Sequence, residues 1–577
     1  MASVPFIPQM FLYPHTDLNQ QDQQWLISQI LSLQEASGEG VTKVLYFDST
    51  TDPMQRAVAA RDTLIVINDG QLHTMAGETI DASNVLLFLS GLLGGVGTVN
   101  AKILAGKRRI FAAGSTITVG AAQNTVGYPE YYGAEPGSLL VDSAPAIEAC
   151  VNTFPITDLA AGDYYLASSL YLRTSNRILR GSGTPSGSQL ANAGGTRLVM
   201  TDPGMTGVII GDPSLAFDVT TIDVSGFTVT ALPIDYSDPA VGIRVRCMRN
   251  LQLHDVNVVG VQTAFEISSI MDVWVTHCRA IIGKADADTT VTCGFKILQT
   301  TPYGSANSSI SSLWLRECEI NYTNTSTVQT TGYGIWSPQG ATGLADLYID
   351  ACNFVGVPMA VSLHGLPANT IQQNVWLRDN TIDNCLSAVE IDGGINAGIV
   401  NNWISCGAYA SASTHRGAYI HDNANAGVTL DGNLIKNSDT STATAYGIRI
   451  AAAHCVKGSN TVINFPNPCF IGVGASTSPL LHGHDLTINA INTKADYTGA
   501  SQGILRAADC WECRLAAGGH GTHVYRVAVE LLGTTYNCVG DVSTANASIA
   551  NAKLINGGTV ISTPFTALGN NNVMIGT

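Results

Sequence analysis

The sequence predicts an all-β chain whose main part is a parallel β-helix, and three observations carry this prediction. A small residue opens a short strand of apolar residues eight times, at intervals of 22 to 40 residues. A second motif repeatedly places cysteine or asparagine at one position. The chain has 58 glycines but only 12% charged residues, which suits strands joined by many turns. The intervals share a minimum length and differ in the number of residues beyond it. This is typical of a solenoid whose coils carry loops of different sizes.

The two motifs define the coil. The first reads small, apolar, any residue, apolar, and it opens at Gly242, Ala264, Gly294, Gly334, Ala360, Ala388, Gly417 and Gly447. The fourth position of the second motif holds Val256, Cys278, Cys318, Cys352, Asn380, Asn402, Asn433 and then Asn460. Equivalent positions of successive coils stack at about 4.8 Å. We therefore expect small side chains in a narrow interior, with the asparagines hydrogen-bonded along a ladder.

Composition excludes several classes of function. A net charge of −16 would repel nucleic acid, and no run of 18 apolar residues is present to insert into a membrane. Thirteen cysteines without framework spacing predict reduced thiols. Cys510-x-x-Cys513 is followed by His520-x-x-His523, but the gap between the pairs is short for a zinc site. We expect neither a metal nor a cofactor.

Changes in pattern divide the chain into four parts. These are residues 1–36, an anchoring segment with a short helix; residues 37–133, a small β-rich domain; residues 134–490, the β-helix; and residues 491–577, a C-terminal β domain where the coil pattern is lost. The short helix places Trp25 and Ile30 on one apolar side. Because it cannot bury that side alone, we expect it to pack against sister chains or a docking partner.

The entry to the β-helix carries a more specific pattern. It consists of Tyr128-Pro-Glu-Tyr-Tyr-Gly-Ala, Asp142-Ser-Ala-Pro-Ala-Ile-Glu-Ala, Leu159-Ala-Ala-Gly-Asp-Tyr-Tyr-Leu and Ile178-Leu-Arg-Gly-Ser-Gly. This order resembles the start of the right-handed, pectate-lyase-like β-helices of bacteriophage tailspikes, over roughly residues 125–490. The resemblance implies that a short helix at residues 142–151 covers the open end of the solenoid. It also implies a C-terminal β-domain for trimerisation or sugar binding.

The first strand of the coil presents a pair of carboxylates. Because the interior of a β-helix is filled, a site must lie on its outer surface, where alternate residues of each strand form columns. Glu390 and Asp392 project outward from one coil, with α-carbons about 6.6–7 Å apart. The residues expected around them are His364 one coil below, Trp336 two coils below, and Arg416, Tyr419 and His421 one coil above.

Such a pair has the groups that hydrolyse glycosidic bonds, one as the acid and the other as the base or nucleophile. We assign the acid to Glu390 and the base to Asp392, with His421 as a further catalytic group. Repulsion between neighbouring like charges would raise the pKa of one carboxyl, as an acid requires. Trp336 and Tyr419 offer flat faces for sugar rings, and His364 and Arg416 complete the expected binding surface.

The second strand offers a rival face. Its outward column reads Trp274, Trp314, Tyr348 and Trp376, a stripe about 15 Å long. Exposed rings suit a chain of sugars, and Asp350, Glu317 and Asp379 would then be the catalytic candidates. The same stripe equally suits contact between the chains of a trimer. The sequence leaves both interpretations open.

Together these features predict a homotrimeric tailspike depolymerase in the tail of the phage virion. It would bind capsular or O-antigen polysaccharide and cut it endolytically, while its N-terminal segment docks on another tail protein. A polysaccharide lyase would instead abstract a proton beside a uronate carboxyl, using Arg416, His421 or Tyr419, with a metal ion or an arginine neutralising that carboxyl. A fibre that binds sugar without cutting it is the third possibility. The sequence does not name the polysaccharide or the bond.

Overall fold

The structure is a computed structural model. It describes residues 43–575 except for residues 48–52, 185–193, 203, 212–218, 235, 237, 284–289, 299–309, 324–331, 339–343, 365–372, 393–395, 408–415, 422–426, 439–444, 452–455, 473–480, 493–502, 509, 512, 522–524, 533–538, 542–548, 557–558, 562–564 and 568–572. For some strand residues, Arg416 among them, it describes only the backbone. The predicted docking segment, residues 1–36, lies outside the described residues.

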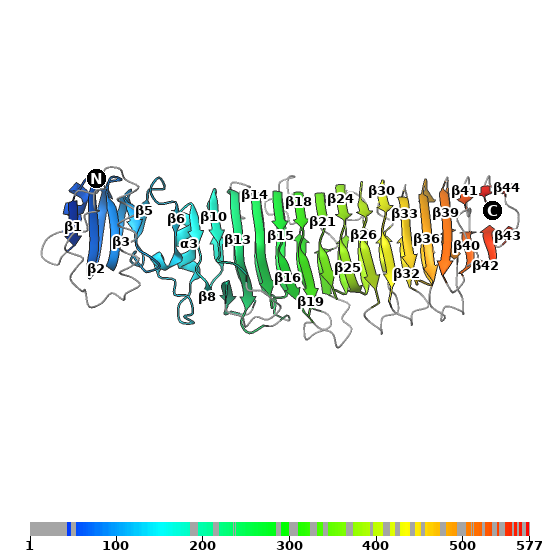
Figure 1. Ribbon diagram of the computed structural model, residues 1–577, viewed down its shortest axis with the longest axis horizontal. Helices are drawn as coiled ribbons and strands as arrows, with labels where there is room; N and C mark the ends of the chain where they lie inside the picture. The colour runs from blue at the N-terminus through cyan, green and yellow to red at the C-terminus, as the bar shows by residue number, and fades with distance from the viewer. Residues whose placement is uncertain are drawn as a thin grey trace, which may run out of the picture. The chain divides into compact units, whose positions relative to one another are not determined.

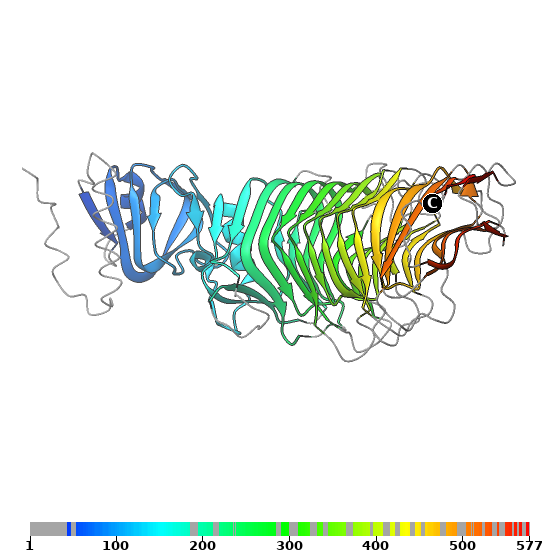
Figure 2. The same ribbon diagram turned by 45° about the vertical axis from the view of Figure 1, so that its right-hand side comes forward.

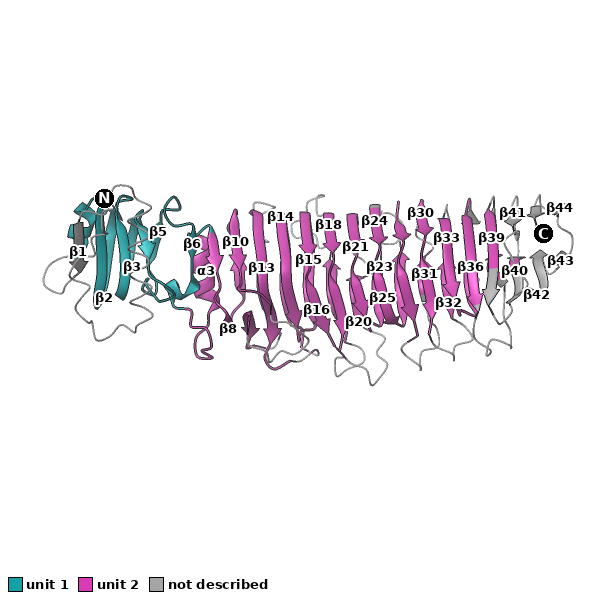
Figure 3. Cartoon of the chain, in the orientation of Figure 1, with its two compact units in different colours: residues 1–133, 153–155 teal, residues 134–152, 156–577 magenta. Residues whose placement is uncertain are grey.

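The chain forms two compact units, residues 1–133 with 153–155 and residues 134–152 with 156–577 (Figure 3). In the first unit, parallel pairing joins β1 (Lys43–Phe47), β2 (Thr63–Ile80), β3 (Val85–Val99) and β4 (Lys102–Leu104), and β5 (Thr116–Val119) pairs with β3. The described part of this unit also contains α2 (Pro53–Ala59), β6 (Val126–Gly127) and a 3₁₀ helix, η2 (Pro129–Tyr132). The sequence predicts strands here, but it does not predict that they run parallel.

The second unit is a parallel β-helix, which confirms the predicted fold. Three ladders of parallel strands run side by side along it (Figures 1 and 2). The first ladder comprises β9 (Leu170–Leu172), β12 (Thr206–Ile210), β14 (Val241–Val259), β15 (Thr263–Thr276), β17 (Thr292–Leu298), β20 (Gly332–Ser337), β23 (Met359–His364), β26 (Ser387–Asp392), β29 (Arg416–Ile420), β32 (Tyr446–Ile450), β34 (Asn467–Ile471), β37 (Gly503–Ala508), β40 (Tyr525–Leu532) and β42 (Ile549–Asn556).

The other two ladders share several long strands with the first or with each other. The second comprises β7 (Ile156–Asp158), β10 (Arg177–Arg180), β13 (Val219–Ala231), β14, β15, β18 (Ile310–Arg316), β21 (Leu344–Asp350), β24 (Gln373–Arg378), β27 (Gly398–Val400), β30 (Val428–Asp431), β33 (Val456–Ile463), β36 (Asp485–Asn492), β39 (Arg514–Gly521), β41 (Val539–Asp541) and β45 (Val573–Ile575). The third comprises β8 (Gly162–Leu166), β11 (Thr196–Met200), β13, β14, β16 (Arg279–Ile282), β19 (Glu319–Tyr322), β22 (Asn353–Val355), β25 (Thr381–Cys385), β28 (Trp403–Cys406), β31 (Leu434–Asn437), β33, β36 and β39.

The predicted interior ladder is present. The side-chain amide of Asn380 donates to Asn402 Oδ1 at 2.9 Å, Asn402 donates to Asn433 at 2.9 Å, and Asn433 donates to Asn460 at 2.8 Å. In earlier coils this position holds Cys278, Cys318 and Cys352, all buried, whose thiols donate to main-chain carbonyls. These three cysteines are small interior residues, as expected.

The small residue of the first motif sits where the chain turns into the first ladder. A Cβ added to Gly334 would lie 2.5 Å from the carbonyl oxygen of Ala360 and 2.8 Å from the ring of Phe354. Ile335, which follows, is fully buried, whereas Trp336 is half-buried on the outside. Two consecutive residues therefore face inward at this corner, and only a small one fits at the first position.

The predicted helix before the solenoid is α3 (Ala144–Thr153). Asp142 Oδ1 accepts a hydrogen bond from the main-chain N–H of Ala144 at 3.1 Å, which caps the helix start. The buried side includes Ile147 and Val151, as expected. Nε of Arg177, at the start of β10, donates to the carbonyl of Val151 at 2.7 Å, so α3 packs against the first coils.

The coils continue past residue 490, which corrects the domain boundary predicted there. Parallel pairing continues from β36 to β39 and from β37 to β40, and antiparallel pairs appear at β42 with β43 (Thr559–Ile561) and at β44 (Phe565–Ala567) with β45. A short separate pair joins β35 (Leu481–His482) to β38 (Cys510–Trp511). Leu505, Leu515 and Val529 still point into the core. Where the structure describes their side chains, the later coils thus keep an apolar interior, although Ile488 and Ala517 follow Asn460 at the ladder position.

Candidate functional site

The outer column of the first ladder follows the predicted register. Lys296 pairs with Trp336, Trp336 with Ser362, Ser362 with Glu390, and Glu390 with Tyr419. The neighbouring inward residues, such as Val389 and Ile391, are fully buried. Backbone pairing therefore places side chains that lie tens of residues apart in sequence about 4.8 Å apart along the helix axis.

Glu390 and Asp392 lie next to each other on the outer side of β26. Each is only 7% exposed, so they are shielded more than an ordinary surface strand would be. Nδ1 of His364 is 3.7 Å from Oδ2 of Asp392, and Nε2 of His421 is 4.0 Å from Oε2 of Glu390. The two imidazole rings are 5.9 Å apart. Two carboxylates and two histidines thus meet on one small area.

Further contacts orient these histidines. The hydroxyl of Ser362 is 3.0 Å from Nε2 of His364, which leaves the other ring nitrogen directed toward Asp392. The ring of His421 lies 3.8 Å from that of Tyr419, and the guanidinium carbon of Arg449 lies 4.8 Å from the Tyr419 ring centre. Each imidazole is held by a residue other than the carboxylate it approaches. Both therefore have defined positions beside the carboxylate pair.

The remaining residues predicted for this face are placed less completely. Trp336 lies two coils below Glu390, as expected from the spacing. The backbone of Arg416 pairs with that of Ser387, one coil above the carboxylate strand. The side chain of Arg416 lies outside the described atoms, so its predicted binding role remains a prediction.

Sequence reasoning missed Tyr333. Its ring lies 5.1 Å from that of Trp336, and the two rings are tilted by 21°. Burial raises the pKa of the Tyr333 hydroxyl, and the nearby charge of Glu390 raises it further. Tyr333 is the second residue of β20 and immediately precedes the corner glycine, Gly334. A period of two counted from Trp336 places Tyr333 on the inside, and only the corner returns it to the outer face.

The rival face is built differently. Trp274, Trp314 and Tyr348 stack on one another, with ring centres 4.5 and 5.7 Å apart and tilts of 3° and 8°. Both faces of the Trp314 ring, and one face each of Trp274 and Tyr348, are therefore occupied by neighbouring rings. Sugars stack on ring faces, so this geometry favours a structural stripe over a sugar platform.

The other candidates on that face are also engaged. Nε and Nη2 of Arg378 donate to the two carboxylate oxygens of Asp350 at 2.9 and 2.8 Å. Trp376 lies over Gly398 of the next coil, where an added Cβ would come 2.3 Å from its ring. The structure thus brings Glu390, Asp392, His364 and His421 together and leaves Trp314, Trp376 and Asp350 in a separate ladder.

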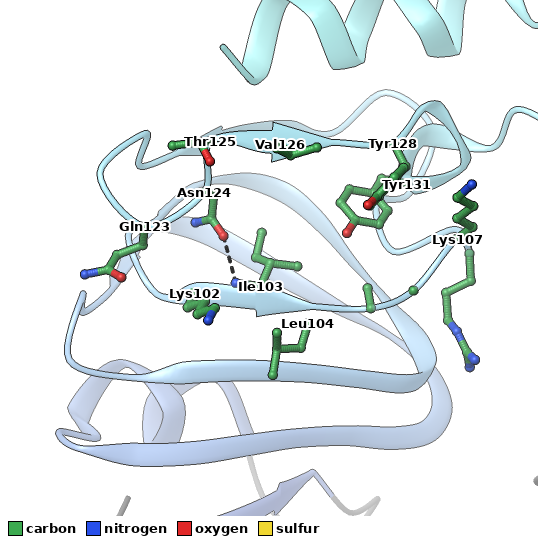
Figure 4. Close-up of a pocket in the computed structure, with 13 residues that line it drawn as sticks. Lys102, Ile103, Leu104, Lys107, Gln123, Asn124, Thr125, Val126, Tyr128 and Tyr131 are labelled. Carbon is green, nitrogen blue, oxygen red and sulfur yellow. Dashed lines mark hydrogen bonds between the residues drawn. The ribbon is translucent and has the colours of Figure 1, made fainter. Parts of the chain in front are cut away.

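A pocket of about 690 Å³ lies in the first unit (Figure 4). Asn124 closes one side, because its Oδ1 accepts from the main-chain N–H of Ile103 at 2.8 Å (Figure 4). Lys102, Lys107 and Tyr128 also line it. The described lining residues offer cations, amides and phenols but no carboxylate, so the pocket does not fit the acid–base chemistry expected of the chain.

No group of three or more His, Cys, Asp or Glu side chains in the described parts could hold a metal ion. Of the Cys510/Cys513 and His520/His523 pattern, the structure describes only one side chain, the buried Cys513. Within the same described parts, no helix is long and apolar enough to cross a membrane.

Comparison with known proteins identifies the fold. A mutant tailspike protein of E. coli bacteriophage HK620, solved in complex with pentasaccharide, matches with a TM-score of 0.50 at 12% identity, over 74% of this chain and 76% of the tailspike chain. The chain has the parallel β-helix fold of a phage tailspike. A DFA-IIIase from Arthrobacter chlorophenolicus A6 without its lid matches with a TM-score of 0.42 at 11% identity, over 76% and 100% of the two chains. No family model and no curated protein matches the sequence. The predicted resemblance to tailspikes is thus confirmed for the fold.

Proposed function

We propose that the chain is a phage tailspike that binds a bacterial surface polysaccharide and cuts it endolytically by glycoside hydrolysis. The observation that carries this proposal is the pair Glu390 and Asp392, side by side on a shielded outer strand with one histidine beside each. The tailspike solved with a pentasaccharide supports a polysaccharide as the ligand. Whether that polysaccharide is capsule or O-antigen is part of the question to be tested.

In this mechanism Glu390 is the general acid, which gives its proton to the leaving glycosidic oxygen. Asp392 is the base that activates water, or the nucleophile that attacks the anomeric carbon. Nδ1 of His364 lies 3.7 Å from Oδ2 of Asp392, where the imidazole can help to position the base. Trp336 and Tyr419 then flank the scissile bond along the column.

The test begins with a panel of purified capsular and O-antigen polysaccharides, scored for viscosity loss and new reducing ends. We expect one of them to be cut by the wild-type chain. Loss of an acid or base typically slows such a reaction by about 10²–10⁴-fold. Glu390→Gln and Asp392→Asn should therefore each cut the polysaccharide at least about 10²-fold more slowly than wild type. Glu317→Gln and Asp350→Asn on the other face are the matched controls and should cut the polysaccharide at the wild-type rate.

Two results would reject hydrolysis at this site. Full activity in the Glu390→Gln, Asp392→Asn double variant would show that cleavage does not need these two carboxylates. Binding of a polysaccharide without any new reducing ends, in wild type and variants alike, would identify an adhesive fibre that does not cut.

A lyase is the second candidate, and the grouping of Tyr419, His421 and Arg449 favours it. A phenol or imidazole could take the proton beside a uronate carboxyl while a guanidinium neutralises that carboxyl. The rings of Tyr419 and His421 are 3.8 Å apart, with Arg449 above Tyr419. A product with the ultraviolet absorbance of an unsaturated uronate would identify elimination, and Tyr419→Phe would then abolish it.

We also propose that the chain acts as a homotrimer in the phage tail, and that residues 1–36 dock on another tail protein. The apolar side of the predicted N-terminal helix and the stacked aromatic stripe of the second ladder support these assignments. Light scattering of the full chain tests the trimer. Loss of incorporation into tails after deletion of residues 1–36, with polysaccharide cleavage retained, tests the docking role.

A further inference from the structure

Three cations surround a single buried carboxylate on the same face as the carboxylate pair. Nε of Arg244 lies 2.6 Å from Oε1 of Glu266, Nη2 of Arg246 lies 3.1 Å from the same oxygen, and Nζ of Lys296 lies 3.9 Å from Oε2. These residues come from β14, β15 and β17, successive strands of the first ladder. We call Arg244, Arg246 and Lys296 the basic cluster.

The cluster carries more positive charge than its partner needs. Burial alone would raise the pKa of Glu266, but the charge and hydrogen bond of Arg244, the hydrogen bond of Arg246 and the charge of Lys296 outweigh it, and the pKa lies below its usual value. Glu266 is therefore ionised at neutral pH, and it offsets one of three positive charges. One cation is enough to neutralise a buried carboxylate. Among the described residues, Glu266 is the one carboxylate within 4.0 Å of these three cations, although the chain has a net charge of −16.

The cations are also accessible, unlike the carboxylate they surround. The side chain of Glu266 is 6% exposed, whereas those of Arg246 and Lys296 are 36% and 27% exposed. Glu266 thus fixes the basic cluster from below, while the cationic groups reach the surface. A guanidinium held in place is well suited to bind a carboxylate through paired hydrogen bonds.

The register connects this cluster to the carboxylate pair. Glu266, Lys296, Trp336, Ser362 and Glu390 are successive members of one column. Four coil spacings separate Glu266 from Glu390, about 19 Å. Nζ of Lys296 lies 5.6 Å from the centre of the Trp336 ring, which stands between the two groups. A sugar chain that reaches the carboxylate pair along this column also passes the basic cluster.

We propose that the basic cluster binds the carboxylate of an acidic sugar several residues from the scissile bond, so that the substrate is a carboxylate-bearing polysaccharide. This inference rests on the proposed function and assigns its substrate class. A uronate and a pyruvate ketal both carry the required carboxylate. A neutral polysaccharide would leave the excess positive charge without a partner.

Binding is measured with the Glu390→Gln, Asp392→Asn double variant, so that cleavage does not consume the ligand. The probes are a uronate-containing capsular polysaccharide, the same polymer after chemical reduction of its carboxyl groups, a pyruvylated capsular polysaccharide and a neutral one. We expect an acidic polymer to bind at least about tenfold more tightly than the carboxyl-reduced or neutral polymer, the discrimination of one charge-assisted contact. The uronate and pyruvate probes separate the two sources of the carboxylate.

Adding Arg246→Gln to the double variant should weaken binding of the acidic polymer about tenfold or more and leave binding of a neutral polymer unchanged. Arg246→Lys should restore part of the affinity, because it keeps the charge. Arg316→Gln removes a more exposed arginine, 66% exposed on the other face, and should change neither. Guanidinium unfolding of Arg246→Gln checks that the coil remains intact.

The outcomes separate this inference from the proposed function. Cleavage of a neutral polysaccharide by wild type, with no preference for acidic polymers and no effect of Arg246→Gln, would overturn the inference and leave hydrolysis standing. Failure to bind or cut any member of the panel would overturn both. Equal effects of Arg246→Gln and Arg316→Gln would also overturn the inference, because the loss of binding would then reflect general surface charge and not the basic cluster.

Discussion

Asn402 gives the strictest test of the stacked coils that hold the carboxylate pair. It is 1% exposed, in the coil that leads into β29. Its Oδ1 accepts from the main-chain N–H of Asn380 at 3.0 Å and from the side-chain amide of Asn380 at 2.9 Å. Its Nδ2 donates to Asn433 Oδ1 at 2.9 Å and to the carbonyl of Leu377 at 3.1 Å. Nδ2 also donates to the carbonyl of Val400 at 3.1 Å, so replacing Asn402 by alanine removes five hydrogen bonds at once, although the Val400 carbonyl still accepts from the main-chain N–H of Asp379.

The size of the loss follows from which groups keep a partner. The side chain of Asn380 still donates to the carbonyl of Ile349, and Oδ1 of Asn433 still accepts from the main-chain N–H of residue 402. The main-chain N–H of Asn380 and the carbonyl of Leu377 lose these bonds. A buried polar group left unsatisfied costs about 1–3 kcal/mol. Asn402→Ala should therefore lower the free energy of unfolding by about 2–6 kcal/mol.

Guanidinium unfolding followed by circular dichroism measures this loss, and Asn353→Ala is the matched control. Asn353 is half-buried on β22, and its Oδ1 has no hydrogen-bond partner among the described residues. Its removal should change stability by less than about 0.5 kcal/mol. Hydrogen exchange of peptides covering residues 377–385 should accelerate in Asn402→Ala only. Equal destabilisation by the two substitutions would refute the claim that the asparagine ladder holds the coils in register.

Two further predictions concern acid stability and the aromatic stripe. The pKa of Glu266 lies below its unfolded value of about 4.3, so the stability it contributes is complete above that pH and is lost as the pH falls through the folded pKa. Unfolding midpoints should therefore fall more steeply under acid in wild type than in Glu266→Gln, and parallel pH profiles would contradict this. Trp314→Ala removes two ring stacks, each worth about 0.5–1.5 kcal/mol beyond the burial of the half-buried ring, and should destabilise the chain by at least about 1–3 kcal/mol while cleavage rates stay unchanged. Reduced polysaccharide affinity at unchanged stability would instead make the stripe a sugar platform.

Much of the coil could be predicted because solenoid geometry makes sequence spacing meaningful. Once the small residue of each coil is aligned, every outward column can be written down, and the pairing of Ser362 with Glu390 and of Glu390 with Tyr419 follows. The interior ladder follows in the same way. Failures occur where this alignment breaks. Tyr333 lies at a corner, and the last coils replace the stacked asparagines with apolar residues, Ile488 and then Ala517.

The sequence by itself determined that the chain winds into coils and which residues share a column. The reason is that a repeated pattern of small, apolar and polar residues buries its apolar side chains when the coils stack. Only the tertiary structure decided how each column presents its side chains. It stacked Trp274, Trp314 and Tyr348 face to face, joined Asp350 to Arg378, and shielded Glu390 and Asp392 beside two histidines. Ring tilt, burial and ion pairing depend on neighbours from other coils, and no count of residues along one strand contains them.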